Sequence, residues 1–435
     1  MSEYYAKPVG QHQRPDKLVV LFAVLIAVFL NQANTVMGIN FSFSDVFCAL
    51  LTIYLIFKNQ FKLLRCPTVY YVILIVHTLF TSLFYVPAHF MFLPRLSSVI
   101  VDSLKLMVVF IYFTLGYSLS LLEVDEPIVK WYSIAAFCIG LLGGLLAAFQ
   151  IRFLTDAFFF GGSRLRGLMN DPNYFSIVQI SAFVYFTRQA RFKPIGKACI
   201  QSVLLFSILA SGSKTGLITL IVYLIFRMAE TLFQKRIEAG TLVSGIFVLM
   251  ASALLLLNPS AVTEKMTRYL SSLIPAFDRL QLVFTDFGNA VSGMGSQRDE
   301  TWTVAVNLIQ RSPIFGIGLG TYSGLAKQLY GTSSIAHNIY LQLFSEWGVL
   351  PASILFTSIF LLIGGAVLRK KMHSAVTIIT RDILIVFLTG SLAISLNNAR
   401  MFWIFFGIFV SNVTRIREAS TNVCESIYPH GHLQL

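Results

Sequence analysis

Long apolar segments recur along most of this chain and leave little polar surface for a soluble domain. A run of about 20 apolar residues is what a helix needs to cross the hydrocarbon core of a bilayer. Of the 435 residues, 56% are hydrophobic and only 12% are charged, whereas soluble domains carry roughly 25% charged residues. The chain is therefore expected to be a polytopic membrane protein. A soluble multidomain enzyme, a disordered scaffold and a secreted disulfide module are excluded.

We predict an all-α fold with about twelve membrane-spanning helices and one large outer loop that contains amphipathic helices. The loop divides the chain into an N-terminal bundle of about nine spans (1–258), the loop itself (259–347), and C-terminal spans with a tail (348–435). The predicted spans are 18–37, 41–57, 68–87, 98–122, 131–150, 173–188, 198–211, 214–232, 241–258, 348–368, 381–397 and 400–416.

The basic residues indicate which side of the membrane each segment faces. With a cytoplasmic N-terminus, 20 of the 33 Lys and Arg residues fall in short cytoplasmic segments, as the positive-inside rule requires. Both termini are then cytoplasmic and the long loop lies on the outer face. Topology thus accounts for most of the +13 net charge, and no nucleic-acid partner is expected. The five cysteines form no CxxC pattern, so neither a disulfide framework nor a zinc site is expected.

A Gly-rich outer segment, GGSRLRGLMNDPNY at 161–174, is the first candidate site. It contains Arg164 and Arg166, and the forked guanidinium group suits phosphate oxygens. Asn173 follows at a predicted helix start. The alternative is a solvated loop whose arginines contact lipid headgroups.

A tight turn, SGSKTG at 211–216, presents Lys214 on the same face. It lacks the residue spacing of a nucleotide-binding P-loop. Turn formation alone also explains its glycine and serine residues. We therefore treat Lys214 as a candidate cation and not as part of a nucleotide site.

The long loop carries two further motifs. Residues from Ser296 predict an amphipathic helix that ends at Arg311, places Arg298 and Trp302 on one face, and lies along the outer membrane surface. The segment GIGLGTY at 316–322 follows, and it is a weak nucleotide signal because the strand–turn–helix context is missing. We interpret it as a flexible loop that approaches a bulky ligand.

The segment AHNIYLQLFSEWG at 336–348 contains His337, the one histidine of the long loop. Taken alone, this histidine is more typical of a structural or surface position than of a catalytic base. Glu346 lies nine residues further on and falls on another side of a helix, so the two are not expected to pair. Arg400 lies in a short outer turn before the last predicted span.

These separate motifs place several cations and one imidazole on the same predicted face. This combination predicts chemistry on a phosphate-bearing substrate at the outer leaflet. The residues are Arg164, Arg166, Lys214, Arg298, His337 and Arg400.

At this point the motifs resemble a known family. The sequence RDETWTVAVNLIQRSPIFGIGLGTY, followed by HNIYLQLFSEWGVL, resembles the O-antigen polymerase/ligase family of Wzy-type membrane glycosyltransferases. RLRGLMNDPNYF and SGSKTG are similar to the upstream motifs of the family, so the resemblance covers about 161–350. Lys214 stands where an arginine is often found, which leaves its role open because lysine cannot bind bidentately. Pro351 stands where a glycine is common.

The resemblance implies an enzyme of the bacterial cytoplasmic (inner) membrane that acts at the outer face. Its donor would be a glycan on undecaprenyl diphosphate, and it would need no metal and no cofactor. A polymerase transfers the growing chain to another lipid-linked repeat unit, whereas a ligase transfers it to lipid A–core. We favour the polymerase, with a chain-length regulator protein as a further partner. A twelve-span transporter or flippase is the remaining alternative, disfavoured because the few charges within spans are scattered and no internal repeat is found.

The resemblance also suggests roles for individual residues. Arg166 and Arg298 would bind the diphosphate and His337 would act as general base, which an unperturbed pKa of about 6.5 permits. Direct attack would invert the anomeric centre. The remaining candidates would contact or position the substrates: Arg164, Lys214, Asn173, Gly318, Tyr322, Asn338, Tyr340, Glu346 and Arg400.

Overall fold

The computed structural model describes residues 15–36, 39–149, 154–189, 191–233, 298–368 and 374–427. The fold is mostly helical, as predicted. Two short antiparallel hairpins were not predicted: β1 (Asn34–Val36) pairs with β2 (Ile39–Phe41), and β3 (Phe159–Phe160) pairs with β4 (Arg164–Leu165). The second hairpin follows directly after the short helix α7 (Thr155–Phe158). Strands this short carry no recognisable alternation of apolar and polar residues.

Five helices in the described part are long and apolar enough to cross a membrane, which supports a multi-pass membrane protein. One run joins α3 (Arg65–Phe80), the π-helical turn η1 (Thr81–Tyr85) and α4 (Val86–Phe90); the others are α5 (Leu96–Leu121), α6 (Asp125–Ala148), α10 (Lys214–Phe233) and α18 (Val349–Leu368). Three shorter apolar helices are α1 (Lys17–Phe29), α2 (Phe43–Phe57) and α9 (Pro194–Ala210).

The predicted number of twelve spans stays a prediction. Its ninth span, 241–258, lies outside the described residues. Another, 173–188, corresponds to α8 (Pro172–Arg188), which is buried along most of its length between α6, α9, α10 and α19 (Ala375–Gly390). An apolar helix of this kind is a core helix of the bundle, and hydropathy alone does not distinguish it from a helix that faces lipid.

The first and last parts of the chain share one core. The helix α20 (Arg400–Ile427) packs along α5, with Gly407 against the backbone of Phe113 and Gly116 against the backbone of Ile404. A Cβ atom at either glycine would overlap the neighbouring backbone, so the close approach of the two helices depends on these small residues.

Several basic residues that the topology prediction assigned to the cytoplasmic surface are buried. Arg188, Arg227 and Arg381 form an ion cluster with Glu230 and Asp382, in which each side chain is at most 8% exposed. The cluster joins α8, α10 and α19. Arg188 and Arg381 therefore act as contacts between helices, and Arg227 pairs with Glu230 within α10.

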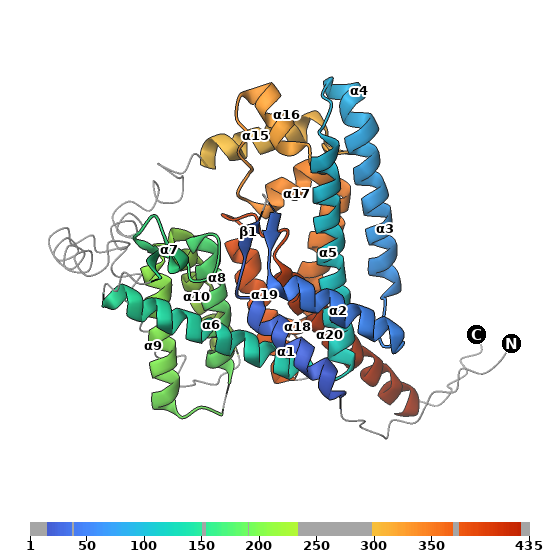
Figure 1. The fold of residues 1–435 in the computed structure, drawn as a ribbon. Helices are drawn as coiled ribbons and strands as arrows, with labels where there is room; N and C mark the ends of the chain where they lie inside the picture. The colour runs from blue at the N-terminus through green and yellow to red at the C-terminus, as the bar shows by residue number, and fades with distance from the viewer. Residues whose placement is uncertain are drawn as a thin grey trace.

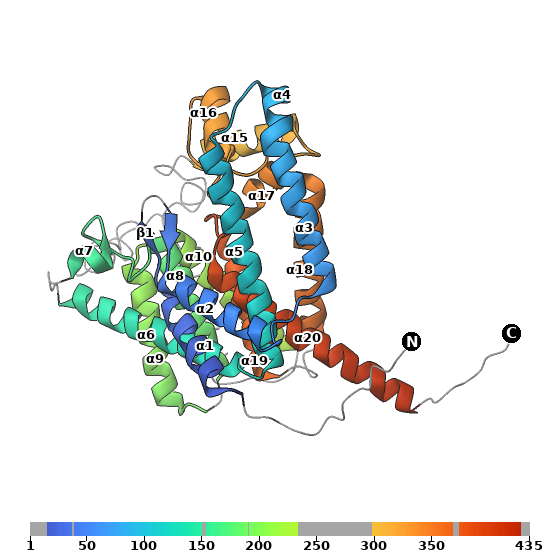
Figure 2. The same cartoon turned by 45° about the vertical axis from the view of Figure 1, so that its right-hand side comes forward.

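Three helices of the predicted long loop gather at one end of the molecule: α15 (Arg298–Arg311), α16 (Tyr322–Tyr330) and α17 (Ile339–Trp347). Figures 1 and 2 show α15 and α16 beside α4, at the end opposite to the beginning of α1 and the end of α20. The end of α15 at Arg311 agrees with the prediction, and the predicted start at Ser296 lies outside the described residues.

The packed face of α15 differs from the predicted face, which contained Arg298 and Trp302. Its buried face consists of Thr301, Val304, Ala305 and Leu308. These side chains face α17 and a small apolar core shared with α4 and α16. Apolar residues on more than one side of this helix made its packed face ambiguous, and tertiary contacts decide it.

Candidate functional site

A cavity of about 1320 Å³ lies between α5, α16, α17 and the 391–399 turn, with the beginnings of α8 and α15 at its edge. Six of the predicted site residues line it: Asn173, Arg298, Tyr322, His337, Glu346 and Arg400. The other predicted residues lie outside this lining: Arg164, Arg166, Lys214, Gly318, Asn338 and Tyr340. The motifs that are distant in sequence therefore do converge, but only in part.

His337 stands at the cavity in a backbone conformation that is unusual for its residue type. Its φ of +49° lies in the left-handed region, which costs a residue with a side chain roughly 1–3 kcal/mol and is found preferentially at functional sites. The next residue, Asn338, begins α17: its Oδ1 accepts hydrogen bonds from the backbone amides of Tyr340 (2.9 Å) and Leu341 (3.1 Å). This cap sets where the helix begins and thus where His337 stands.

Two side-chain contacts hold the beginning of α17 against α19 and the turn that follows it. The Nδ2 of Asn338 donates to the carbonyl oxygen of Leu392 (3.1 Å), and the hydroxyl of Tyr340 donates to the carbonyl oxygen of Leu388 (2.9 Å). Asn338 and Tyr340 therefore position His337 without lining the cavity.

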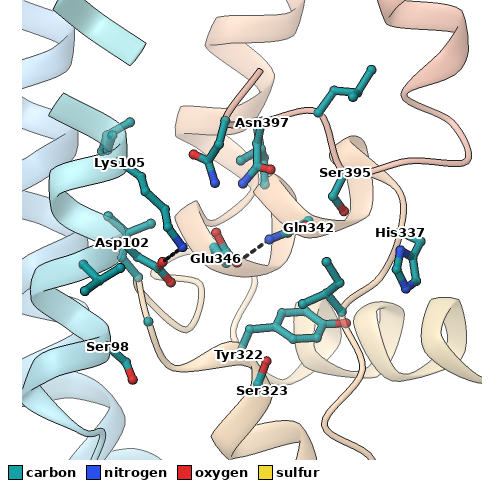
Figure 3. Close-up of a pocket in the computed structure, with 18 of the residues that line it drawn as sticks. Ser98, Asp102, Lys105, Tyr322, Ser323, His337, Gln342, Glu346, Ser395 and Asn397 are labelled. Atoms are coloured by element: carbon teal, nitrogen blue, oxygen red, sulfur yellow. Dashed lines mark hydrogen bonds and ion pairs between the residues drawn. The ribbon is translucent and has the colours of Figure 1, made fainter. Parts of the chain in front are cut away.

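The surroundings of His337 favour its neutral form. Burial lowers the pKa of the imidazole, and the nearby charge of Arg298 lowers it further, while Asp171 acts in the opposite direction. A neutral imidazole has a free ring nitrogen that can accept a proton. Figure 3 shows the imidazole at one side of the cavity, on the segment that leads into α17.

Arg298 is the first residue of α15, and the 211–216 turn lies beside it. Its Nη2 reaches the hydroxyl oxygen of Thr215 at 3.5 Å. The same turn holds two other predicted residues: the carbonyl oxygen of Ser211 accepts from Nε of Arg164 (3.0 Å), and Oγ of Ser213 donates to Oδ1 of Asn173 (2.9 Å). The SGSKTG motif, whose Lys214 begins α10, therefore contacts both the 161–174 segment and Arg298.

Arg164 and Arg166 lie outside the cavity lining. Arg164 is buried, and besides Ser211 it contacts Oδ1 of Asn173 through Nη2 (3.3 Å). Arg166 donates from Nη2 to the carbonyl oxygen of Asp156 (2.7 Å), which ties β4 to α7.

The GIGLG segment is a packing element. Gly316, Gly318 and Gly320 all have positive φ, and the backbone amide of Gly318 donates to the carbonyl oxygen of Glu346 (2.9 Å). Its other side faces Ser82 of η1, where a Cβ atom at Gly318 would overlap. The segment therefore fixes the end of α17, and only its last residues, Leu319 and Gly320, line the cavity.

Several polar residues of the cavity were missed by the sequence prediction. Asp102 and Lys105 of α5 form an ion pair (2.8 Å), and Nε2 of Gln342 donates to Oε1 of Glu346 (2.9 Å). Figure 3 shows both pairs on the side of the cavity formed by α5 and α17. The signal was present in the sequence, because charges three residues apart within an apolar segment indicate a polar environment on one side of a helix.

Glu346 is buried, and its environment opposes ionisation. Burial and the neighbouring charge of Asp102 raise the pKa of its carboxyl to about 8, although Gln342 and Lys105 act in the opposite direction. Near neutral pH this carboxyl is therefore predominantly protonated. Within the described residues, no group of three or more His, Cys, Asp or Glu side chains could hold a metal ion.

Comparison with known proteins gives a match to a family model. No curated protein matches the chain. Residues 201–357, which span the 211–216 turn, α15 and α17, match a family model, Wzy_C, described as O-antigen ligase. Members of this family are membrane enzymes similar to glycosyltransferases. This match confirms the resemblance to the O-antigen polymerase/ligase family that the motifs indicate.

Proposed function

We propose that this chain polymerises oligosaccharide repeat units carried on undecaprenyl diphosphate, at the outer face of the cytoplasmic membrane. The main support is the convergence of Arg298 and His337, which come from separate motifs, on one cavity large enough for a glycan. The family match supports a glycan polymerase or ligase. A large cavity with a few convergent polar groups is also the expected form of a small-molecule site.

In the proposed reaction, a neutral His337 removes the proton from the attacking hydroxyl of the acceptor sugar. The hydroxyl oxygen forms the new bond to the anomeric carbon of the donor, and the bond from that carbon to the diphosphate oxygen breaks. The diphosphate leaves with the bonding electrons, and Arg298 stabilises its charge. A direct displacement of this kind inverts the anomeric centre.

The other phosphate contacts are assigned to cations that line the cavity. Arg95, which precedes α5, and Lys327 of α16 are both in the lining. Arg164 and Arg166 are assigned instead to the wall behind it, because their guanidinium groups contact backbone carbonyl oxygens of Ser211 and Asp156.

A ligase is the second candidate, because the matching family model is described as O-antigen ligase. Its chemistry at the anomeric carbon would be the same, and only the acceptor would differ. Lipid extracts of cells that lack the gene distinguish the two. Loss of a polymerase leaves single repeats on the final acceptor, whereas loss of a ligase leaves long chains on the carrier lipid.

The transfer itself is tested with purified full-length protein and lipid-linked repeat units in detergent. Wild-type protein is expected to make longer lipid-linked chains, and His337→Ala is expected to reduce the rate at least 100-fold. His89→Ala is the matched control, because His89 is an exposed histidine of α4 outside the cavity lining. Wild-type polymer from His337→Ala would contradict the assignment of the base.

The phosphate contact is tested by Arg298→Lys, which keeps the charge but cannot form the fork. We expect a loss of at least tenfold in rate. Arg311→Lys, at the other end of α15, is the control, and full activity of Arg298→Lys would contradict a bidentate contact with the diphosphate.

A further inference from the structure

The side of the cavity formed by α5, α16 and α17 carries polar groups that the proposed transfer does not use. We propose that this side is a sugar subsite, in which Tyr322, Gln342 and Trp347 bind the hydroxyl groups of an uncharged sugar ring. The inference rests on the proposed function, because the sugar would belong to the lipid-linked glycan.

The first support is a set of buried polar atoms without hydrogen-bond partners. The hydroxyl of Tyr322, Oε1 of Gln342 and Nε1 of Trp347 have no partner among the described residues. Their residues are only 3%, 7% and 3% exposed, and all three line the cavity. Buried polar atoms in native proteins are nearly always paired, so three orphans on one wall indicate a place where a ligand supplies the partners.

The type of each orphan atom limits what the ligand can be. The indole N–H of Trp347 only donates, the amide oxygen of Gln342 only accepts, and the hydroxyl of Tyr322 does both. Phosphate oxygens that are ionised accept but do not donate, so a diphosphate cannot satisfy Gln342. An isoprenoid chain satisfies none of the three. A sugar carries hydroxyl groups that donate and accept, and it satisfies all of them.

The ionisable groups around Gln342 favour an uncharged sugar ring. Asp102 and Lys105 pair with each other at 2.8 Å, and the Glu346 carboxyl receives a hydrogen bond from Gln342. Burial and Asp102 raise the pKa of Glu346 to about 8, so these three groups together carry no net charge near neutral pH. Arg95 and Lys327, which also line the cavity, are exposed cations.

A pair of tyrosines on α16 provides a matched test. Tyr330, like Tyr322, has a buried hydroxyl without a partner among the described residues, but Tyr330 does not line the cavity. Replacing either residue with Phe removes one unpaired buried hydroxyl, which is not expected to destabilise the free protein. Thermal unfolding of both variants verifies that each is folded.

The probe is the free repeat-unit oligosaccharide without lipid and without diphosphate, titrated into detergent-solubilised full-length protein by isothermal calorimetry. Tyr322→Phe is expected to weaken binding roughly 2- to 13-fold, the equivalent of one hydrogen bond. Gln342→Met is expected to weaken it by a similar factor, and Tyr330→Phe is expected to leave it unchanged. Unchanged affinity in both Tyr322→Phe and Gln342→Met, or an equal loss in Tyr330→Phe, would overturn the subsite.

The same variants separate the subsite from the proposed function. If wild-type protein binds the oligosaccharide but transfers nothing, the transferase assignment fails and the subsite stands. If it transfers glycan while Tyr322→Phe and Gln342→Met retain wild-type affinity, the subsite fails alone. Donor hydrolysis, in which water replaces the acceptor hydroxyl, identifies the source of the sugar. The two variants slow this hydrolysis if the donor glycan occupies the subsite, and slow only the transfer if the acceptor does.

Discussion

The guanidinium group of Arg400 forks onto both carboxylate oxygens of Asp45, with Nε 2.5 Å from Oδ1 and Nη2 2.6 Å from Oδ2. These two residues are 355 positions apart in the sequence, and their contact joins the beginning of α20 to the beginning of α2. Asp45 also accepts from the backbone amide of Ser42 (3.1 Å) and from the hydroxyl of Tyr112 (3.0 Å). Arg400 lines the cavity, but its main partner is this carboxylate.

We therefore expect Arg400 to stabilise the fold more than it binds substrate. Asp45→Asn and Arg400→Gln should each lower the unfolding temperature, and the double variant should lose less than the sum because the two residues share one interaction. A coupling free energy of about 1–3 kcal/mol is expected from a double-mutant cycle measured by thermal unfolding in detergent. Additive losses, or an Arg400→Gln variant that is inactive but as stable as the wild type, would contradict this role.

The comparison of Arg400 with Arg298 illustrates what the sequence could predict about the site. Both are arginines in polar segments next to helices, and both were expected to bind phosphate. Hydropathy and motif spacing predicted that both arginines lie on the outer face, and both line the cavity. The pairing of Arg400 with a carboxylate depends on a residue of α2, and a contact of that sequence separation leaves no local pattern.

Helix bounds were predictable where local chemistry determines them, and packing was not. The end of α15 follows from Pro313, two residues beyond Arg311. The burial of α8 and the ion cluster around Arg381 depend on neighbouring helices. For the same reason Asp102 was interpreted as one of a few scattered charges, although it lies in the cavity wall.

The pH dependence of transfer should report the surroundings of His337. Because burial and Arg298 lower the pKa of its imidazole, the acid side of the rate profile should fall below pH 6.5, where the base becomes protonated. Arg298→Gln removes a cation, so the pKa of His337 should rise. The residual activity of this variant should then begin to decrease at a higher pH as the solution is made more acidic.

Asp171→Asn should have the opposite effect, because the carboxylate of Asp171 raises the pKa of His337. An Asn at this position can still accept the bonds that Asp171 receives from the backbone amides of Asn173 (2.7 Å) and Tyr174 (3.2 Å), so α8 keeps its cap. Opposite shifts of the two rate profiles are expected. Profiles that do not move in either variant would show that another group titrates.

The stability of the protein should decrease with pH because of Glu346. Its carboxyl has a pKa of about 8 in the folded protein against an ordinary value of about 4.5, so the folded state binds more protons between these pH values. Stability is then greatest below about pH 4.5 and is lost as the pH rises toward 8. Glu346→Gln keeps an acceptor for Gln342 and cannot ionise. This variant should unfold at a higher temperature than the wild type above pH 8, with little difference near pH 5.

Glu300→Gln is the control for that experiment, since Glu300 is an exposed carboxyl in the first turn of α15. It should not change the slope of unfolding temperature against pH. A wild-type slope in Glu346→Gln would show that the Glu346 carboxyl is ionised in the folded protein at neutral pH.

The buried ion cluster should be the most sensitive point of the helical bundle. Asp382 is 0% exposed and accepts from Nε of Arg188 (2.7 Å) and from Nη2 of Arg381 (2.7 Å). Asp382→Asn leaves these guanidinium groups buried with one carboxylate fewer, which should cost about 3–5 kcal/mol of folding free energy.

Glu126→Gln is the control: its contact with Arg191 is 3.4 Å long between side chains that are 50% and 77% exposed, and such surface pairs contribute little. Thermal unfolding in detergent should therefore show a large decrease for Asp382→Asn and almost none for Glu126→Gln. Equal effects would mean that the cluster is hydrated, because water would then compensate the lost carboxylate as it does at the surface.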